Sequence, residues 1–360
     1  MDHSALAAPH LPVLIHLDGE VAPLAFPSPT QSFFKHTERF MSAARRIDVH
    51  QHVVPPFWAE ELPLNGGDQS GTVIPRWSPQ SAVDMMDSQQ IATGILSLTA
   101  PSVAAWKPAE RRTVARRVNE YTADLVVKRP NRFGHFATLS LPDVDGALHE
   151  IEYALDELRA DGVVLLSNYE GKYLADPTFE PLWAELDRRR AVVFVHPGLP
   201  QIPGLDAVAA PMVDYPFDTT RAAVQLVQNG VIDRYRHVRI ILAHAGGFLP
   251  YASHRFAQLA RVFRPDADSP ADILAKFRRF YFDTALSASP VALPALKAFA
   301  GTERILFGSD FPYVSADIAG TFTAQLDAYE DFTVTERKSV NHGNAWTLFP
   351  RLAPQYDKAA

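Results

Sequence analysis

Five residues that can bind metal ions lie at the ends of four apolar runs. His50 and His52 close the run Arg-Ile-Asp-Val-His-Gln-His, His196 and His244 close two later runs, and Asp310 follows Ile-Leu-Phe-Gly-Ser. Because side chains at i and i+2 of a strand point to the same side, His50 and His52 can both reach one ion. A third imidazole from His196 and a carboxylate from Asp310 complete a ligand set that suits Zn²⁺, with Mn²⁺ as the alternative.

These residues can meet only if the ends of distant strands converge. Eight short runs rich in Val, Ile, Leu and Phe predict buried strands at 46–50, 93–98, 133–139, 162–166, 191–196, 238–244, 280–283 and 304–309. Segments with helical periodicity lie between these runs, at 79–90, 109–128, 144–159, 179–189 and 219–229.

This alternation predicts an α/β fold, namely a (β/α)8 TIM barrel with an N-terminal extension. An open doubly wound sheet is the rival arrangement, but the sequence has neither a G-x-G-x-x-G segment after the first strand nor a P-loop. In a barrel the carboxyl ends of the strands form one catalytic face, so we expect the five residues to lie together there.

The composition excludes several classes of protein. Of the 360 residues 47% are hydrophobic, which is ample for a folded core, and the absence of cysteine rules out disulfides, a cysteine nucleophile and iron–sulfur clusters. The net charge of −7 argues against a nucleic-acid partner. Because no apolar run reaches about 18 residues and the start does not resemble a signal peptide, we expect a cytoplasmic protein without a membrane partner.

The chain divides into two parts of different character. Residues 1–44 contain several prolines and phenylalanines and no sustained period, whereas residues 45–360 carry the barrel pattern. The first part is predicted to be an arm that packs on the barrel or on a second subunit, and a tail without packing is the alternative. Together with the resemblance described next, the arm predicts a homodimer.

Four motifs resemble those of a known enzyme family. Asp-Val-His-Gln-His, the His-Pro after the fifth strand, His-Ala-Gly-Gly-Phe-Leu-Pro and Gly-Ser-Asp-Phe-Pro are similar to segments of the amidohydrolase superfamily. The resemblance covers residues 45–352 and is closest to the decarboxylase branch that includes aminocarboxymuconate semialdehyde decarboxylase and 6-methylsalicylate decarboxylase. It implies a metal-dependent barrel enzyme, and relatives are commonly dimers.

The resemblance also implies roles for individual residues. His50, His52, His196 and Asp310 match the metal ligands, and His244 matches an acid–base histidine beside the metal. Arg255 matches an arginine that relatives use to bind the substrate carboxylate, sometimes across a dimer interface. The fourth strand, Gly-Val-Val-Leu-Leu-Ser-Asn, lacks the lysine that two-metal members carry there, so one metal ion is expected.

Other residues near the predicted strand ends suggest an acidic, aromatic or conjugated substrate. Arg76 and Arg255 could pair with a carboxylate. Asp48 and Asp283 could support the ligands. Six aromatic residues could line the pocket: Trp58, Trp77, Tyr169, Tyr173, Phe311 and Tyr313.

The leading hypothesis is a metal-dependent, non-oxidative decarboxylase of a small aromatic or unsaturated carboxylic acid. A ring carbon would be protonated before CO₂ leaves, with Asp310 as the acid and His244 in support, or the reverse. The same residues could instead activate water, as in a lactonase or amidase. A barrel that keeps its metal without catalysing a reaction is the third reading.

Overall fold

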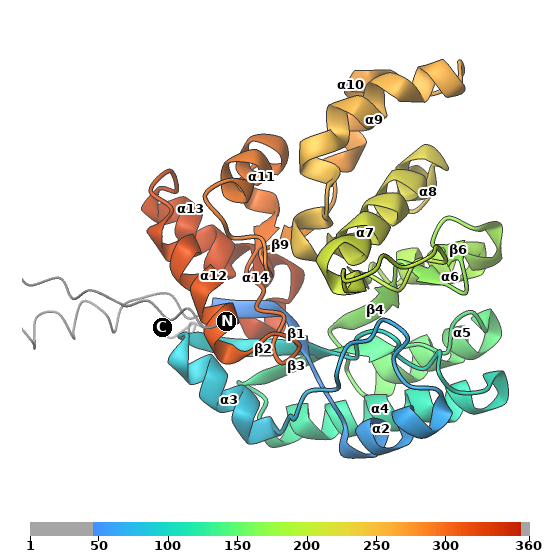
Figure 1. The fold of residues 1–360 in the computed structure, drawn as a ribbon, viewed down its shortest axis with the longest axis vertical. Coiled ribbons are helices and arrows are strands. Elements are labelled where there is room, and N and C mark those ends of the chain that lie inside the picture. The colour runs from blue at the N-terminus through green and yellow to red at the C-terminus, as the bar shows by residue number, and fades with distance from the viewer. Residues whose placement is uncertain (1–45, 354–360) are drawn as a thin grey trace, which may run out of the picture. The chain divides into compact units, whose positions relative to one another are not determined.

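The computed structural model describes residues 46–353, which form a barrel of parallel strands surrounded by helices (Figure 1). Eight strands follow one another in the order β1-β2-β3-β4-β7-β8-β9-β10. Their bounds are β1 Arg46–His52, β2 Ile91–Ser97, β3 Phe133–Thr138, β4 Gly162–Leu166, β7 Val192–His196, β8 Arg239–Leu242, β9 Tyr281–Asp283 and β10 Ile305–Leu306. A short antiparallel hairpin, β5 Asn168–Tyr169 and β6 Lys172–Tyr173, follows β4.

Helices occupy the connections between successive strands of the barrel and follow the last strand. They are α2 Pro56–Glu61, α3 Pro79–Ser88, α4 Pro108–Lys128, α5 Val144–Glu152, α6 Glu180–Arg188, α7 Ala210–Gln228, α8 Val231–Arg234, α9 Leu249–Phe263, α10 Pro270–Phe277, α11 Ala292–Ala300, α12 Ala316–Ala328, α13 Val334–Lys338 and α14 Asn344–Leu348. None of these described helices is long and apolar enough to cross a membrane.

The barrel is closed by contacts between β1 and the segment that includes and follows β10. The backbone N–H of Val49 donates to the carbonyl of Phe307 at 3.0 Å, and Asp310 N–H donates to His50 at 2.8 Å. A parallel bridge joins Gln51 to Phe311. These contacts confirm the TIM barrel and exclude the open doubly wound sheet.

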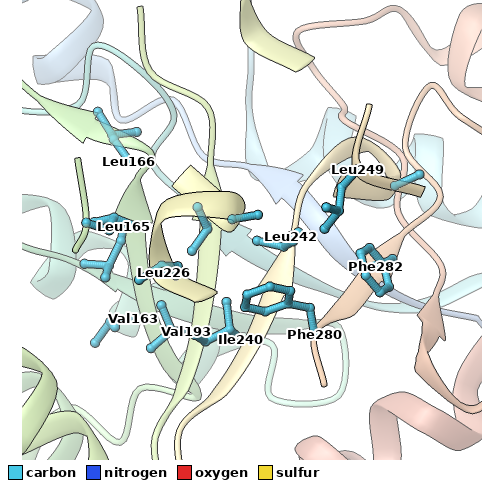
Figure 2. Packing of buried hydrophobic residues seen from close by; sticks show 14 of the residues in the cluster. Val163, Leu165, Leu166, Val193, Leu226, Ile240, Leu242, Leu249, Phe280 and Phe282 are labelled. Carbon is cyan, nitrogen blue, oxygen red and sulfur yellow. The ribbon is translucent and has the colours of Figure 1, made fainter. Parts of the chain in front are cut away.

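Alternate residues of the same strands pack into two separate cores. Inside the barrel, Phe136 and Phe194 stack with ring centroids 5.4 Å apart. Outside it, Val163 and Val193 belong to a second cluster with residues of the helices, such as Leu226 of α7, as Figure 2 shows. Burial on both faces explains why these strands read as continuous apolar runs.

The structure differs from the sequence prediction most clearly in three elements. The last strand has only two residues, Ile305 and Leu306, and the segment after it approaches β1 so closely that a Cβ at Gly308 would lie 2.9 Å from the Cβ of His50. The helix expected at 219–229 already begins at Ala210 and continues through Pro216. The helix expected at 144–159 becomes a π-helical turn at Tyr153–Glu157. The predicted arm, residues 1–44, lies outside the described residues.

His135 of β3 is predicted to make stability depend on pH. Neither ring nitrogen has a hydrogen-bond partner in the described structure, and burial lowers the pKa of this residue from 6.5 to about 4. Between these values the unfolded chain binds a proton that the folded chain does not, so stability is lost as pH falls from about 6.5 toward 4. The His135→Leu variant of the metal-free protein should escape this loss, which amounts to roughly 3 kcal/mol at most.

Urea unfolding at several pH values checks this expectation. The exposed His149 provides a control, because His149→Leu should keep the wild-type dependence on pH. Equal pH dependence in the wild type and His135→Leu would show that His135 does not contribute.

Candidate metal centre and active site

The barrel brings together the five residues singled out in the sequence. His50 and His52 lie at the end of β1, His196 ends β7, and His244 and Asp310 follow β8 and β10. Asp310 Oδ1 lies 3.1 Å from His50 Nε2 and 3.0 Å from His52 Nε2, and these two nitrogens are 3.1 Å apart. The ligand atoms of His50, His196, His244 and Asp310 all lie within 4.8 Å of one another.

Three of the imidazoles are held by their second ring nitrogen. His50 Nδ1 lies 2.8 Å from Oδ2 of Asp283, and His196 Nδ1 lies 2.9 Å from the carbonyl of Pro197. His52 Nδ1 lies 3.1 Å from the hydroxyl and 3.3 Å from the carbonyl of Ser97. Carboxylates and carbonyls only accept hydrogen bonds, so Nδ1 carries the hydrogen of the neutral ring and Nε2 keeps its lone pair.

The site therefore directs lone pairs of three Nε2 atoms and a carboxylate toward one buried point. Such an arrangement is repulsive unless a cation lies between the donors, and it is the arrangement that ligating histidines show when a carboxylate or carbonyl orients them. The residues present therefore fit one divalent metal ion.

Electrostatics at this point also favour a positive centre. In the metal-free protein, burial lowers the pKa of His50, but the carboxylates of Asp283 and Asp310 outweigh this effect and raise it to about 10, so a proton occupies the position at Nε2 that a metal ion would take. Burial raises the pKa of Asp310, yet the surrounding histidines, chiefly His50, hold it well below its usual range. Asp310 is consequently an anion at neutral pH and is available as a ligand.

Asp48 joins β1 to the segment after β10, next to the metal site. Its Oδ1 accepts hydrogen bonds from the backbone N–H groups of His50 at 3.1 Å and Ser309 at 3.0 Å. Its Oδ2 accepts from the hydroxyl of Ser309 at 2.6 Å. One fully buried carboxylate thus positions the residues next to His50 and Asp310, as the sequence suggested for Asp48.

Asp218 of α7 plays a similar part beside His196, and the sequence did not indicate it. Its carboxylate accepts hydrogen bonds from Ser167, Asn168 and Tyr173. The backbone N–H of Ser167 donates to the carbonyl of His196 at 2.9 Å, so Asp218 holds the segment against which His196 lies. The sequence signal for this cluster was the polar pair Ser167 and Asn168, which directly follows the apolar run 162–166.

A cavity of about 500 Å³ opens above the metal site. His196, His244 and Asp310 form one part of its lining, and most of the remaining wall is apolar. The apolar lining includes Pro211, Met212, Phe248, Leu286, Val314 and Phe322. Such a cavity suits a small, largely apolar ligand with a polar group directed at the metal ligands.

Several residues expected at the pocket lie elsewhere. Among the six aromatic residues only Tyr313 lines this cavity, whereas Trp58 is fully buried in the core. Arg76 and Arg255 are both exposed and neither lines the cavity. Tyr215, Phe322 and Asp68 do line it, and they lie on helices and a loop for which the sequence pattern carried no site signal.

Comparisons with known proteins agree with this geometry. The sequence profile of the family described as amidohydrolase matches residues 47–351. The 6-methylsalicylic acid decarboxylase of Penicillium expansum is 43% identical over 322 residues, which are 87% of this chain and 99% of that protein.

Two solved structures share the fold. A crystal structure named amidohydrolase II has a TM-score of 0.80 and 29% identity, with 85% of this chain and 99% of that chain covered. The 5-carboxyvanillate decarboxylase of Novosphingobium aromaticivorans, solved with manganese and a nitrobenzoic acid, has a TM-score of 0.76, with 86% of this chain and 96% of that chain covered. At 20% identity the second structure supports the fold alone. The chain belongs to the amidohydrolase family and, within it, to the branch that includes the 6-methylsalicylic acid decarboxylases.

Proposed function

We propose that this protein is a metal-dependent carboxy-lyase that removes CO₂ from a small aromatic acid with a hydroxyl group next to the carboxylate, such as 6-methylsalicylate. The observation that carries the proposal is the convergence of the imidazoles of His50, His52 and His196 with Asp310 below a mostly apolar cavity. The 43% identity to a 6-methylsalicylic acid decarboxylase over nearly its whole length supports this substrate class.

His50, His52, His196 and Asp310 are the proposed ligands of one ion. A divalent ion at this place would bind the carboxylate and the neighbouring oxygen of the substrate and neutralise their charge. We propose zinc, which suits three imidazoles and one carboxylate, and manganese is the alternative, as it is present in the 5-carboxyvanillate decarboxylase structure. A cytoplasmic location stays a prediction of the sequence.

His244 is the proposed source of the proton rather than a ligand. Unlike the other three imidazoles, its Nδ1 is buried without a partner in the described structure, so no acceptor orients its ring as a ligand. Its Nε2 lies 3.4 Å from Oδ2 of Asp310. Because Asp310 is anionic at rest, it can protonate the substrate only after receiving a proton, and His244 is placed to supply it.

The reaction then requires one proton and one bond cleavage. A proton from the His244–Asp310 pair is added to the ring carbon that bears the carboxylate, which removes the aromaticity of that ring. The bond to the carboxylate breaks, its electron pair returns to the ring, and CO₂ leaves. The pair regains its proton from solvent. Overall, a hydrogen replaces the carboxylate on the ring and CO₂ is released.

We also propose that the protein is a homodimer formed through α7 and α9, which lie side by side (Figure 1). Tyr251 of α9 is 89% exposed and Phe263 is 79% exposed, and an apolar groove lies between the two helices. Arg255 lies one turn after Tyr251 on the same helix face. In such a dimer Arg255 would face the partner, which would explain its absence from the cavity of its own chain. A role of Arg76 in binding the substrate carboxylate stays a prediction.

Substitution of a proposed ligand should remove the metal. We expect His50→Ala to lower the metal content from one ion per chain to a small fraction of this value and to lower CO₂ release more than a hundredfold, because both binding and charge neutralisation are lost. Plasma mass spectrometry and a CO₂ assay measure the two effects. The exposed His149→Ala variant is the control, and full metal content in His50→Ala would contradict the ligand assignment.

Purified protein should release CO₂ from 6-methylsalicylate, and a chelator should abolish the release until metal is added back. Adding zinc and manganese separately identifies the more active ion. If no CO₂ is released by protein with one ion per chain, and solvent ¹⁸O enters the products of a lactone or amide substrate, the hydrolase reading replaces this proposal.

Light scattering should give twice the mass of one chain at micromolar concentration. Tyr251→Glu should shift the protein to the monomer, because it places a charge in the proposed apolar interface. Val127→Glu is the matched control, since Val127 is 78% exposed on α4. A monomeric wild type would rule out the homodimer.

A further inference from the structure

We infer that Asp68 determines substrate specificity by accepting a hydrogen bond from a second hydroxyl group on the aromatic ring. This inference rests on the proposed function and names the substrate class more narrowly. The carboxylate lies in the lining of the metal-site cavity but makes no hydrogen bond or ion pair with the five converging residues. We therefore expect Asp68 to contact a part of the substrate other than the carboxylate that is held at the metal ligands.

Asp68 lies at the boundary between two cavities. A second cavity of about 290 Å³ adjoins the first, and Asp68, Ala100 and Tyr215 line both. None of the five converging residues lines the second cavity. Asp68 is thus where the first cavity meets the second one, which the five converging residues do not line.

The carboxylate of Asp68 has hydrogen-bonding capacity to spare. Its Oδ1 accepts from the backbone N–H of Ser70 at 2.8 Å, and no lysine or arginine between residues 46 and 353 forms an ion pair with it. The side chain is only partly exposed, and burial raises its pKa while the hydrogen bonds from Ser70 lower it. A half-buried carboxylate without a cation is unfavourable unless a donor reaches it.

Two tyrosines, Tyr215 and Tyr313, line the cavity together with Asp68 and Asp310. The ring of Tyr215 lies 6.4 Å from that of His196. The ring of Tyr313 lies 5.4 Å from that of His52. A flat ring lying along these aromatic walls would therefore extend from the metal ligands toward Asp68.

The chemistry of a carboxylate then ranks the possible substituents. A phenolic hydroxyl donates a hydrogen bond to Asp68, a ring hydrogen leaves the carboxylate without a donor, and a second carboxylate is repelled. When the substrate carboxylate is held at the metal ligands, the ring position para to it points farthest away. The favoured substrates are consequently 2,4-dihydroxybenzoates with an alkyl group at position 6, and 6-methylsalicylate, which lacks the second hydroxyl, is a slower substrate of the same site.

The test compares two acids that differ by one hydroxyl group. The ratio of kcat/KM for 2,4-dihydroxy-6-methylbenzoate to that for 2-hydroxy-6-methylbenzoate should be at least tenfold in the wild type. It should fall to within about threefold of unity in Asp68→Ala and take an intermediate value in Asp68→Asn, which keeps an acceptor for Ser70. Asp206→Asn, an equal charge change at an exposed loop residue, should keep the wild-type ratio.

The ratio decides the inference whatever the absolute rates are. A wild-type ratio near unity, or an unchanged ratio in Asp68→Ala, overturns it. A variant that unfolds is recognised by its melting curve, and in that case Asp68→Asn provides the comparison.

Binding of the carboxylate-free phenols separates this inference from the proposed function. If neither acid is decarboxylated, the proposed function fails, but calorimetry with 3-methylphenol and 5-methylresorcinol still tests Asp68. The resorcinol should bind the metal-loaded wild type at least tenfold more tightly than the phenol, and Asp68→Ala should abolish the difference. Equal affinities, or no binding of either at millimolar concentration, contradict the role of Asp68.

Discussion

The seam between the first and last strands is the constraint on which the whole site depends. His52 and Asp310 are 258 residues apart in the chain, yet closure of the barrel places their ligand atoms 3.0 Å from each other. The seam tolerates no side chain at Gly308, and the buried carboxylate of Asp48 spans it. Without this closure β1 would contribute two histidines to an incomplete site.

Much of this architecture was predictable because the signals are local. Strands buried on both faces read as unbroken apolar runs, and their carboxyl ends meet in a barrel, so polar residues there were expected to converge. The boundaries were less predictable where long-range packing decides them. The apolar run did not reveal that β10 ends at Leu306, and the periodic pattern did not reveal that α7 continues through Pro216.

The convergence of the five strand-end residues could be predicted from the sequence, whereas the walls of the cavity could not. A histidine at a strand end has a position that the fold dictates, but the direction of a loop or helix side chain depends on tertiary packing. Trp58 illustrates the difference, because its indole donates to the carbonyl of Ser102 inside the core and never reaches the cavity. Tyr215 and Asp68 reach it from a helix and a loop that the sequence left unassigned.

The distribution of the ligands along the chain has a consequence for how the enzyme matures. During synthesis the two histidines of β1 leave the ribosome long before Asp310 is added, so the nascent chain has no complete ligand set for most of its translation. If the proposed residues hold an ion, the full ligand set becomes available only in a chain that is nearly finished and already folding. The metal pool that the completed barrel meets would then influence which ion is bound, and a chain truncated before Asp310 would lack the carboxylate of the site.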